Sequence, residues 1–270
     1  MSKLLIKAPA KLNLHLQVLD ERNDGYHNIA SYFTFINFFD ELEFSLTEDE
    51  IILRESPAID NNLVIQAAEL IKNESKTSLG VEIKLLKTIP QQKGLGGGSS
   101  DAAATLIALN KIWNLNYSKQ ELQDMGLILG SDIPFFIHGY SCWSEGRGEI
   151  FSPIKLKESW FLLVLPEAKI STKLAFDNLN LEIESTISKE EFLQGKRVNS
   201  FTNWVRDNYS EIDALFQKLE LVGSPQLTGT GSAIFLECDS KQDAQQKLLK
   251  IPQAFLVKSL DHSPLLQIIE

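Results

Sequence analysis

The most informative stretch of the sequence is Lys93-Gly94-Leu95-Gly96-Gly97-Gly98-Ser99-Ser100-Asp101, which contains four glycines. Such a run lets a ligand approach the main-chain N–H groups and permits positive φ angles. It follows an alternating, strand-like run at 81–86 and precedes a helix-forming run at 101–109. A helix N-terminus offers free N–H groups and the positive end of the helix dipole. The sequence therefore predicts a phosphate-binding loop between a strand and a helix.

Two familiar phosphate loops do not match this stretch. A Walker loop requires Gly-Lys-Ser/Thr at its end, whereas here Ser99 follows Gly98 directly. A dinucleotide fingerprint has glycines at its first, third and sixth positions, and counting from Gly94 puts Ser99 at the sixth. The joining of glycines, serines and a helix also argues against a loop without a function.

Length and composition indicate an ordinary globular protein of two modest domains. The chain has 270 residues, of which 43% are hydrophobic and 23% charged. A division near Phe151-Ser152-Pro153 gives domains at 1–152 and 153–270. The net charge of −10 argues against nucleic-acid and anionic-membrane partners, because either would require a basic surface.

The cysteines and the N-terminus indicate a cytoplasmic protein. Cys142 and Cys238 lie far apart in the sequence and form no metal-binding pattern, so no metal ligands are predicted and a reducing compartment is favoured. No apolar leader follows Met1, and no apolar run reaches the length of a membrane span.

An alternating pattern at 9–18 predicts a strand with one face toward the core. The core-facing residues are expected to be Leu12, Leu14, Leu16 and Val18, and those of the other face Lys11, Asn13, His15 and Gln17. Lys11 and Asn13 are candidate site residues, although by itself Lys11 reads as a solvated strand lysine. His15 is expected to be at the surface or partly packed.

The next segments predict a polar turn, a central strand and a capped helix. The turn at Asp24-Gly25 ends in Tyr26 and His27, which either meet a ligand or pack against the loop. Apolar residues on both faces of 29–39 predict a strand covered on both sides, and 42–46 reads as a further strand. Asn61 or Asn62 is expected to cap a helix through Ile71.

Asp132 lies in Gly130-Ser131-Asp132-Ile133-Pro134, where Pro134 is expected to make Ile133 extended. A carboxylate at such an element end, followed by apolar residues, could be half-desolvated and accept a proton. The alternative is a turn or capping aspartate. Residues 139–150 predict a glycine-punctuated strand or hairpin, with Glu145, Arg147 and Glu149 in solvent.

The second half predicts strands at 160–165, 233–238 and 255–260 with helices between them, which favours a ferredoxin-like split βαβ layer. A second glycine turn at 227–232 holds Gly229 and Thr230. Its backbone either approaches the ligand or only makes a tight turn.

Three motifs in this order resemble the GHMP family of small-molecule kinases: 9–14, 94–101 and 227–232. The segments Arg22-Asn23-Asp24-Gly25-Tyr26-His27 and 130–135 are similar to the branch that phosphorylates a cytidine-diphosphate-linked methylerythritol in the non-mevalonate route to isoprenoid precursors. The resemblance implies an α+β fold of two domains, an N-terminal GHMP kinase domain with the ATP loop and the base, and a ferredoxin-like C-terminal domain.

The resemblance also implies roles for individual residues. Asp132 would be the general base and Lys11 its charged neighbour. Asn13 would orient the erythritol, Tyr26 and Phe176 would enclose the cytosine, and His27 would hydrogen-bond its edge. Gly229 and Thr230 would contact the substrate. The ATP-binding residues would be Asn62, Leu63, Gly94, Leu95, Gly96, Gly97, Gly98, Ser99 and Ser100. Mg²⁺ is expected with ATP, held by Ser99, Ser100 or the phosphates themselves.

The chain departs from the family pattern at the loop entrance, where Gln92 and Lys93 replace small residues. Lys93 either adds a positive charge near the phosphates or points to solvent. Other hypotheses are a kinase of the same fold for homoserine, mevalonate or a sugar, and a nucleotide-binding protein without activity. A dinucleotide oxidoreductase is a more distant alternative. The sequence predicts no oligomeric state.

Overall fold

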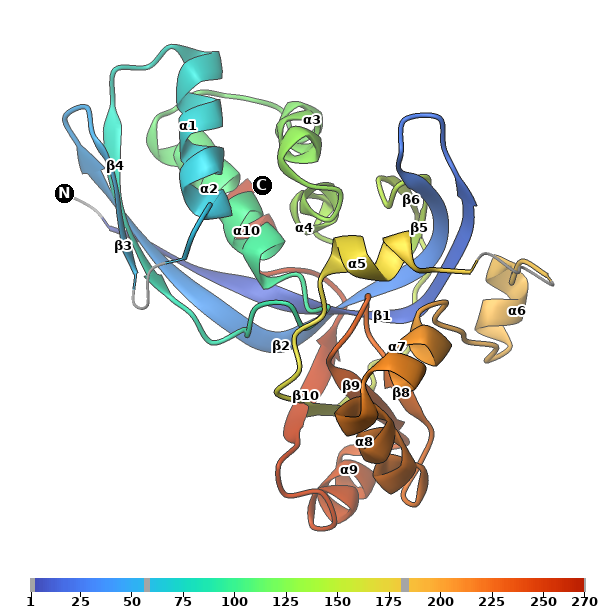
Figure 1. Cartoon of the computed structure of the whole chain (residues 1–270). Helices are drawn as coiled ribbons and strands as arrows, with labels where there is room; N and C mark the ends of the chain where they lie inside the picture. Colours follow the sequence, from blue (N-terminus) through green and yellow to red (C-terminus); the bar gives the residue numbers. More distant parts are fainter. Residues whose placement is uncertain (1–2, 56–58, 181–184, 270) are drawn as a thin grey trace.

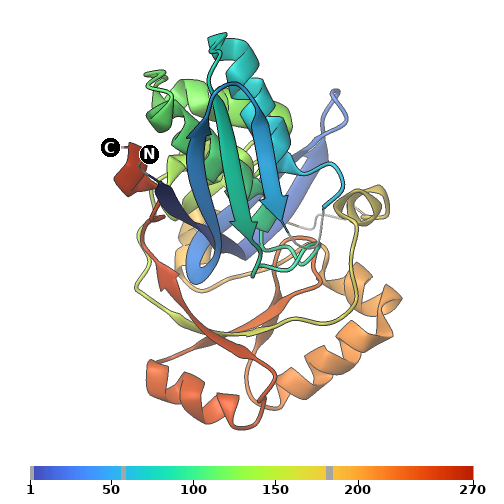
Figure 2. The ribbon, with the colours of Figure 1, turned by 90° about the vertical axis from the view of Figure 1, so that its left-hand side faces the viewer.

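In the first half of the chain, a mostly antiparallel sheet carries helices on one of its faces (Figures 1 and 2). The computed structural model describes residues 3–55, 59–180 and 185–269. The strands are β1 (Leu4–Glu21), β2 (His27–Thr47), β3 (Ile51–Glu55), β4 (Gly80–Leu86), β5 (Cys142–Glu145) and β6 (Ile150–Ser152). The helices are α1 (Leu63–Ser75), α2 (Gly97–Ile112), α3 (Lys119–Leu129) and α4 (Ile133–His138).

Strand β2 is central, because it pairs with β1, β4, β5 and β10 (Phe255–Leu260). Its residues 29–36 are buried on both faces, as the sequence predicts. The runs at 29–39 and 42–46, expected as separate strands, are one continuous strand. No proline or glycine interrupts the chain between them, so the strand has no reason to end.

The apolar residues of strand β1 do not all pack into the same hydrophobic cluster. The register of β1 against β2 shifts between Asn13 and His15. Leu12 and Leu14 therefore pack into one hydrophobic cluster of buried residues, whereas Leu16 and Val18 pack into a second one. A bulge of this kind exchanges the faces of the residues that follow it. The expectation that all four apolar residues share one face was wrong.

The helices of the first half begin largely where their capping residues predict. The Asn62 side chain accepts the Val64 N–H at the start of α1, and Ser118 and Glu121 form both bonds of a capping box at α3. Helix α2 starts at Gly97, so the last two glycines of the run form its first turn. The glycine run is thus part of the helix as well as of the loop before it.

Helix α4 was not predicted, and the expected extended geometry of Ile133 was wrong. Ile133 is the first residue of α4, and Asp132 precedes it with a helical φ of −80°. Pro134 lies in the first turn, where a missing N–H leaves no helical hydrogen bond unmade. The proline therefore starts a helix here instead of excluding one.

The second half confirms the ferredoxin-like split βαβ layer. The order β10-β7-β9-β8 is antiparallel throughout, and helices separate the strands in the sequence β7–helices–β8–β9–α9–β10. Its strands before β10 are β7 (Trp160–Val164), β8 (Pro225–Leu227) and β9 (Ile234–Cys238). Its helices are α5 (Thr172–Asp177), α6 (Lys189–Leu193), α7 (Thr202–Asn208), α8 (Ser210–Glu220) and α9 (Lys241–Leu248).

A strand pairing and a helix contact join the two halves of the chain. Strand β10 pairs with β2 at Ser259↔Ile36 and Leu260↔Phe35. The last helix, α10 (Leu266–Ile269), returns to α2, and Leu266 packs against Gly139. A division near residue 152 stays a prediction. None of the helices within the described ranges is long and apolar enough to cross a membrane.

Candidate active site

A cleft of about 810 Å³ receives residues from both halves of the chain. It lies where β1, the glycine loop, the start of α4, the β5–β6 turn and α5 meet. The predicted site residues that line it are Lys11, Asn13, Tyr26, His27, Asn62, Leu63, Gly94, Leu95, Gly96, Gly97, Gly98, Ser99, Asp132, Phe176, Gly229 and Thr230. The structure thus brings together segments that are far apart in the sequence.

The glycine loop presents the start of α2 to this cleft. Gly96 has a left-handed φ of +69° and turns the chain into the helix. The first N–H groups of a helix have no partner within it, and here they belong to Gly97, Gly98 and Ser99. Ser100 is fully buried, and its N–H donates to the Gly96 carbonyl at 2.9 Å, so that N–H already has a partner within the helix.

The loop is held against β1 and the second glycine turn. The Lys11 N–H donates to the Leu95 carbonyl at 3.0 Å, and the Asn13 N–H donates to Thr228 Oγ1 at the same distance. Thr228 Oγ1 in turn donates to the Gly94 carbonyl at 3.3 Å. Gly94 has a φ of +73°, and a Cβ there would overlap the Thr228 carbonyl. The second glycine turn therefore closes on the loop backbone.

Lys11 and Asp132 form an ion pair beside the loop. Lys11 Nζ lies 3.6 Å from Asp132 Oδ2 and donates to Asn13 Oδ1 at 2.6 Å. The stem of Lys11 runs past Gly96, where a Cβ would come within 3.2 Å of Lys11 Cγ. The lysine is only 3% exposed, whereas the Asp132 side chain is 37% exposed. A half-buried carboxylate thus faces the cleft next to the loop, with a buried ammonium behind it.

Aromatic residues lie around the β1–β2 turn. The His27 and Phe176 rings pack against each other with their centroids 4.9 Å apart. The Tyr26 ring carries the guanidinium of Arg147, whose Cζ lies 3.4 Å from the ring centroid. Arg147 lines the cleft, so its expected place in solvent was wrong. A charged residue between two glycines reads as a solvated turn, and nothing local in the sequence reveals its contact with Tyr26.

Lys93 has neither of the roles considered for it. Its ammonium donates to the carbonyls of Pro166 at 2.6 Å, Glu167 at 3.1 Å and Ala168 at 2.5 Å, and to Ser232 Oγ at 3.2 Å. The residue is buried, and burial lowers the pKa of its ammonium. Lys93 therefore ties the entrance of the glycine loop to the second half of the chain.

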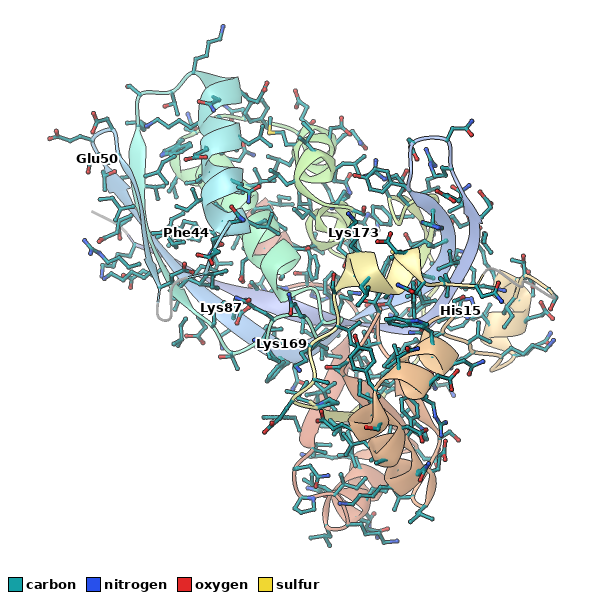
Figure 3. All side chains as sticks on the ribbon, in the orientation of Figure 1. His15, Phe44, Glu50, Lys87, Lys169 and Lys173 are labelled. Carbon is teal, nitrogen blue, oxygen red and sulfur yellow. The ribbon has the colours of Figure 1, made fainter. Side chains whose placement is uncertain are left out.

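A buried charge network that the sequence did not suggest supports the start of α2. Lys87, labelled near that end of the helix in Figure 3, lies 2.5 Å from Asp40 and 2.7 Å from Asp101. Burial raises the pKa of Asp101 to about 8, although the Lys87 charge opposes this shift. Burial alone would lower the pKa of Lys87, but the two carboxylates outweigh it and raise that pKa.

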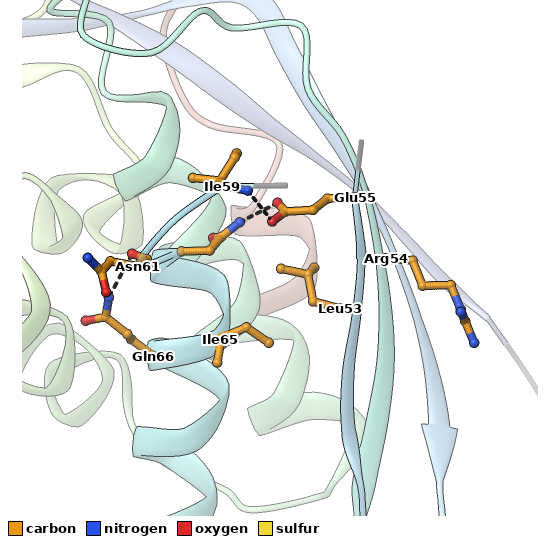
Figure 4. A pocket seen from close by; sticks show the side chains of 8 residues that line it. Leu53, Arg54, Glu55, Ile59, Asn61, Ile65 and Gln66 are labelled. Carbon is orange, nitrogen blue, oxygen red and sulfur yellow. Dashed lines mark hydrogen bonds between the residues drawn. The ribbon is translucent and has the colours of Figure 1, made fainter. Parts of the chain in front are cut away.

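A second pocket of about 1050 Å³ adjoins the cleft between β3 and α1 (Figure 4). Ile59, Asn61 and Asn62 line both spaces. The Asn62 Nδ2 group donates to Glu55 at 2.5 Å, while its Oδ1 caps α1. The side chain of Arg54, at the edge of this pocket, extends away from the other labelled residues in Figure 4 and donates to Glu82. The Asn62 amide is therefore engaged in holding the two sides of this pocket together.

Comparison with known proteins identifies the relatives of this chain. The family model described as the GHMP kinases N terminal domain matches residues 62–140. Two proteins named 4-diphosphocytidyl-2-C-methyl-D-erythritol kinase are similar over nearly the full length. That from Colwellia psychrerythraea is 38% identical over 97% of this chain and 92% of its own. That from Chromobacterium violaceum is 38% identical over 96% of this chain and 95% of its own.

Solved structures agree with these relatives. A crystal structure of 4-(cytidine 5'-diphospho)-2C-methyl-D-erythritol kinase has a TM-score of 0.82 and 27% identity, and covers 95% of this chain and 99% of that one. A mevalonate kinase with a TM-score of 0.69 and 16% identity, covering 96% of this chain and 99% of its own, shares the fold. The chain therefore belongs to the 4-diphosphocytidyl-2-C-methyl-D-erythritol kinase family of GHMP kinases.

Proposed function

We propose that this chain transfers the γ-phosphoryl group of ATP to the 2-hydroxyl of 4-diphosphocytidyl-2-C-methyl-D-erythritol, in the non-mevalonate route to isoprenoid precursors. The observation that carries the proposal is the Lys11–Asp132 pair, 3.6 Å apart, packed directly beside the glycine loop. A phosphoryl donor on the loop and an acceptor hydroxyl at Asp132 would then be neighbours. Holding the two reactants together is a large part of catalysis in such enzymes.

Asp132 is the proposed general base. Its carboxylate takes the proton of the acceptor hydroxyl as the oxygen attacks the γ-phosphorus, and the bond from that phosphorus to the β-phosphate oxygen breaks to release ADP. The Lys11 ammonium offsets negative charge on the attacking oxygen. Asn13 already accepts a hydrogen bond from Lys11 and donates to Ser31 Oγ at 2.9 Å, so its amide is oriented before a substrate arrives.

The glycine loop is the proposed site of the ATP phosphates. The N–H groups of Gly97, Gly98 and Ser99 would bind phosphate oxygens, and Gly98 leaves room for them because it is exposed and lies on the cleft. Leu63 and Asn62 would border the adenine. Ser99 lines the cleft with its hydroxyl available to a metal ion or a phosphate.

Mg²⁺ is proposed to enter with the nucleotide. Within the described ranges, no three His, Cys, Asp or Glu side chains come together as a metal site. The ion would therefore be held chiefly by phosphate oxygens, with a Ser99 or Ser100 hydroxyl as the protein's contribution. When bound, it neutralises charge on the phosphates. The buried Ser100 Oγ has no hydrogen-bond partner in the described chain, which is compatible with this use.

The cytidine end of the substrate is assigned to the aromatic side of the cleft. Tyr26, His27 and Phe176 all line it there, and His27 and Phe176 are in contact. An aromatic surface with an imidazole edge suits a pyrimidine base, which stacks through its face and hydrogen-bonds through its edge. Gly229 and Thr230 would contact the linker or the polyol.

A panel of acceptors tests the proposal. Purified protein is mixed with ATP and Mg²⁺, and ADP release is followed with the cytidylyl polyol, homoserine, mevalonate and a sugar in parallel. We expect ADP only with the cytidylyl polyol, and inhibition of that reaction by CDP. Equal or faster ADP release with another acceptor would instead identify a kinase of the same fold with a different substrate. ATP binding without ADP from any acceptor would identify a nucleotide-binding protein without activity.

A further inference from the structure

Arg147 is a cation in the cleft without an ionic partner. It lies in the turn between β5 and β6, and no carboxylate of the described residues comes within ion-pair distance of it. Its buried Nε has no hydrogen-bond partner in the part of the chain that the structure describes. Two nearby carboxylates have other partners, because Glu149 accepts the Arg147 main-chain N–H at 2.6 Å and Asp24 forms an ion pair with Arg22. Arg22 is the main cause that lowers the pKa of Asp24, and the Arg147 charge adds to it. In a chain with a net charge of −10, a cleft guanidinium that forms no ion pair with the described residues indicates an anionic ligand.

The turn that carries Arg147 contacts both Tyr26 and Phe33, which line the cleft. On one side, the guanidinium covers the Tyr26 ring. On the other, a Cβ at Gly148 would lie 3.8 Å from the Phe33 ring. Lys11 Nζ lies 5.2 Å from the centroid of that same ring. All four residues Tyr26, Arg147, Lys11 and Asp132 line the same cleft. A ligand with its base near Tyr26 and its reacting hydroxyl near Lys11 and Asp132 would therefore bring its linking group close to the turn that carries Arg147.

We propose that Arg147 binds the diphosphate that links the cytidine to the polyol, and that Tyr26 holds its guanidinium ready to do so. This inference rests on the proposed function. A guanidinium presents a planar fork of N–H donors that fits phosphate oxygens two at a time. Stacking on Tyr26 restricts the side chain in advance, so less conformational freedom is lost when the ligand binds.

The proposal also assigns the two faces of Tyr26. The ring face under Arg147 is occupied at stacking distance, so a base cannot use it while the guanidinium remains. A cytosine that stacks on Tyr26 would use the opposite face. Tyr26 would then connect base recognition to linker recognition, because one ring positions both the pyrimidine and the guanidinium.

The test compares Arg147→Met, Arg147→Lys and the wild-type protein. The inhibition constants of CDP and of cytidine, and the KM values of the cytidylyl polyol and ATP, are measured for each. For Arg147→Met we expect CDP inhibition and substrate affinity to weaken roughly 10- to 100-fold, as for loss of a charge-assisted hydrogen bond. Cytidine inhibition and the KM of ATP should stay within about twofold, and Arg147→Lys should recover part of the loss.

Controls distinguish a failure of the Arg147 assignment from misfolding of the variant and from a failure of the proposed function. Arg54→Met removes an exposed arginine that pairs with Glu82 and does not line the cleft, and it should leave all four constants unchanged. Equal weakening of CDP and cytidine would show that Arg147 acts only through the Tyr26 ring, and unchanged CDP inhibition would show no contact; either overturns the inference. Failure of the proposed function differs, because then the wild-type protein itself makes no ADP with the cytidylyl polyol. Thermal unfolding of each variant checks that it is folded.

Discussion

Gly94 and Gly98 belong to the same run, but they are glycines for different reasons. Gly94 has a φ of +73° and faces the Thr228 carbonyl, so a side chain there meets both backbone strain and a clash. At Gly98, a Cβ would make only an ordinary contact of 3.7 Å with Leu63. Packing within the protein therefore requires glycine at position 94. At position 98 the protein itself has room for a side chain, so the requirement for glycine would come from a ligand bound at the start of α2.

Alanine substitutions should separate these two requirements. Gly98→Ala should keep or slightly raise stability, by up to about 1 kcal/mol, because alanine suits a helix better than glycine. It should nevertheless raise the KM of ATP at least about tenfold, because the new methyl group would point at the phosphates. Gly94→Ala should lower the free energy of unfolding by more than about 2 kcal/mol. Urea unfolding and steady-state kinetics measure both, and unchanged ATP binding in Gly98→Ala would contradict the assignment of the loop.

At the scale of elements, regular patterns and capping residues predicted most of the secondary structure. Strand-like runs and the asparagine cap in the sequence located β4, α1, β7, β9 and β10. The predictions were wrong where a long-range contact or a local irregularity determines the backbone conformation. The bulge in β1 depends on its register with β2, and α4 depends on a proline that starts a helix instead of preventing one. Arg147 and Lys93 have roles set by distant partners, and no local pattern contains them.

Lys93 offers a test of how the loop entrance is held. Lys93→Met keeps the length of the side chain but leaves the carbonyls of Pro166, Glu167 and Ala168 without their charged donor, at a cost of roughly 1–3 kcal/mol of unfolding free energy. The loop before α2 should also lose order, which raises the KM of ATP. The exposed neighbour Lys169, labelled in Figure 3, provides the control, and Lys169→Met should change neither quantity. Equal effects of the two substitutions would refute the role assigned to Lys93.

At the scale of the whole molecule, buried groups join the parts of the chain. His15 of β1 stacks on Trp143 of β5, with centroids 5.3 Å apart, and its Nδ1 accepts the Val198 N–H at 3.3 Å. Burial, aided by the charge of Arg197, lowers the pKa of His15 to about 4. Burial likewise lowers the pKa of His138 to about 4, with a contribution from Lys119. The expectation that His15 lies at or near the surface therefore missed a residue of the core.

These pKa values predict a loss of stability in mild acid. Above about pH 6.5 both histidines are neutral whether the chain is folded or not, so they have no effect on the balance. Between pH 6.5 and 4 only the unfolded chain binds their protons, so each histidine contributes a fall of roughly 2–3 kcal/mol in the free energy of unfolding. The raised pKa of Asp101 acts in the opposite sense over this range, because the folded carboxyl keeps a proton that the unfolded one loses. Urea unfolding across this range measures the fall. His15→Phe keeps the stack on Trp143 and should remove the His15 contribution, so its stability should fall by roughly 2–3 kcal/mol less than that of the wild type across this range. A folded variant with the same fall as the wild type would contradict the assignment.

The central claim is that the glycine loop holds ATP while the Asp132 carboxylate takes the proton of the acceptor hydroxyl. Its most direct test is Asp132→Asn, with turnover of the cytidylyl polyol and the Kd of ATP measured on the same preparation. The account predicts a loss of turnover of about 10²- to 10⁴-fold, with the Kd of ATP within about twofold of the wild-type value. Near-wild-type turnover in this variant would contradict it.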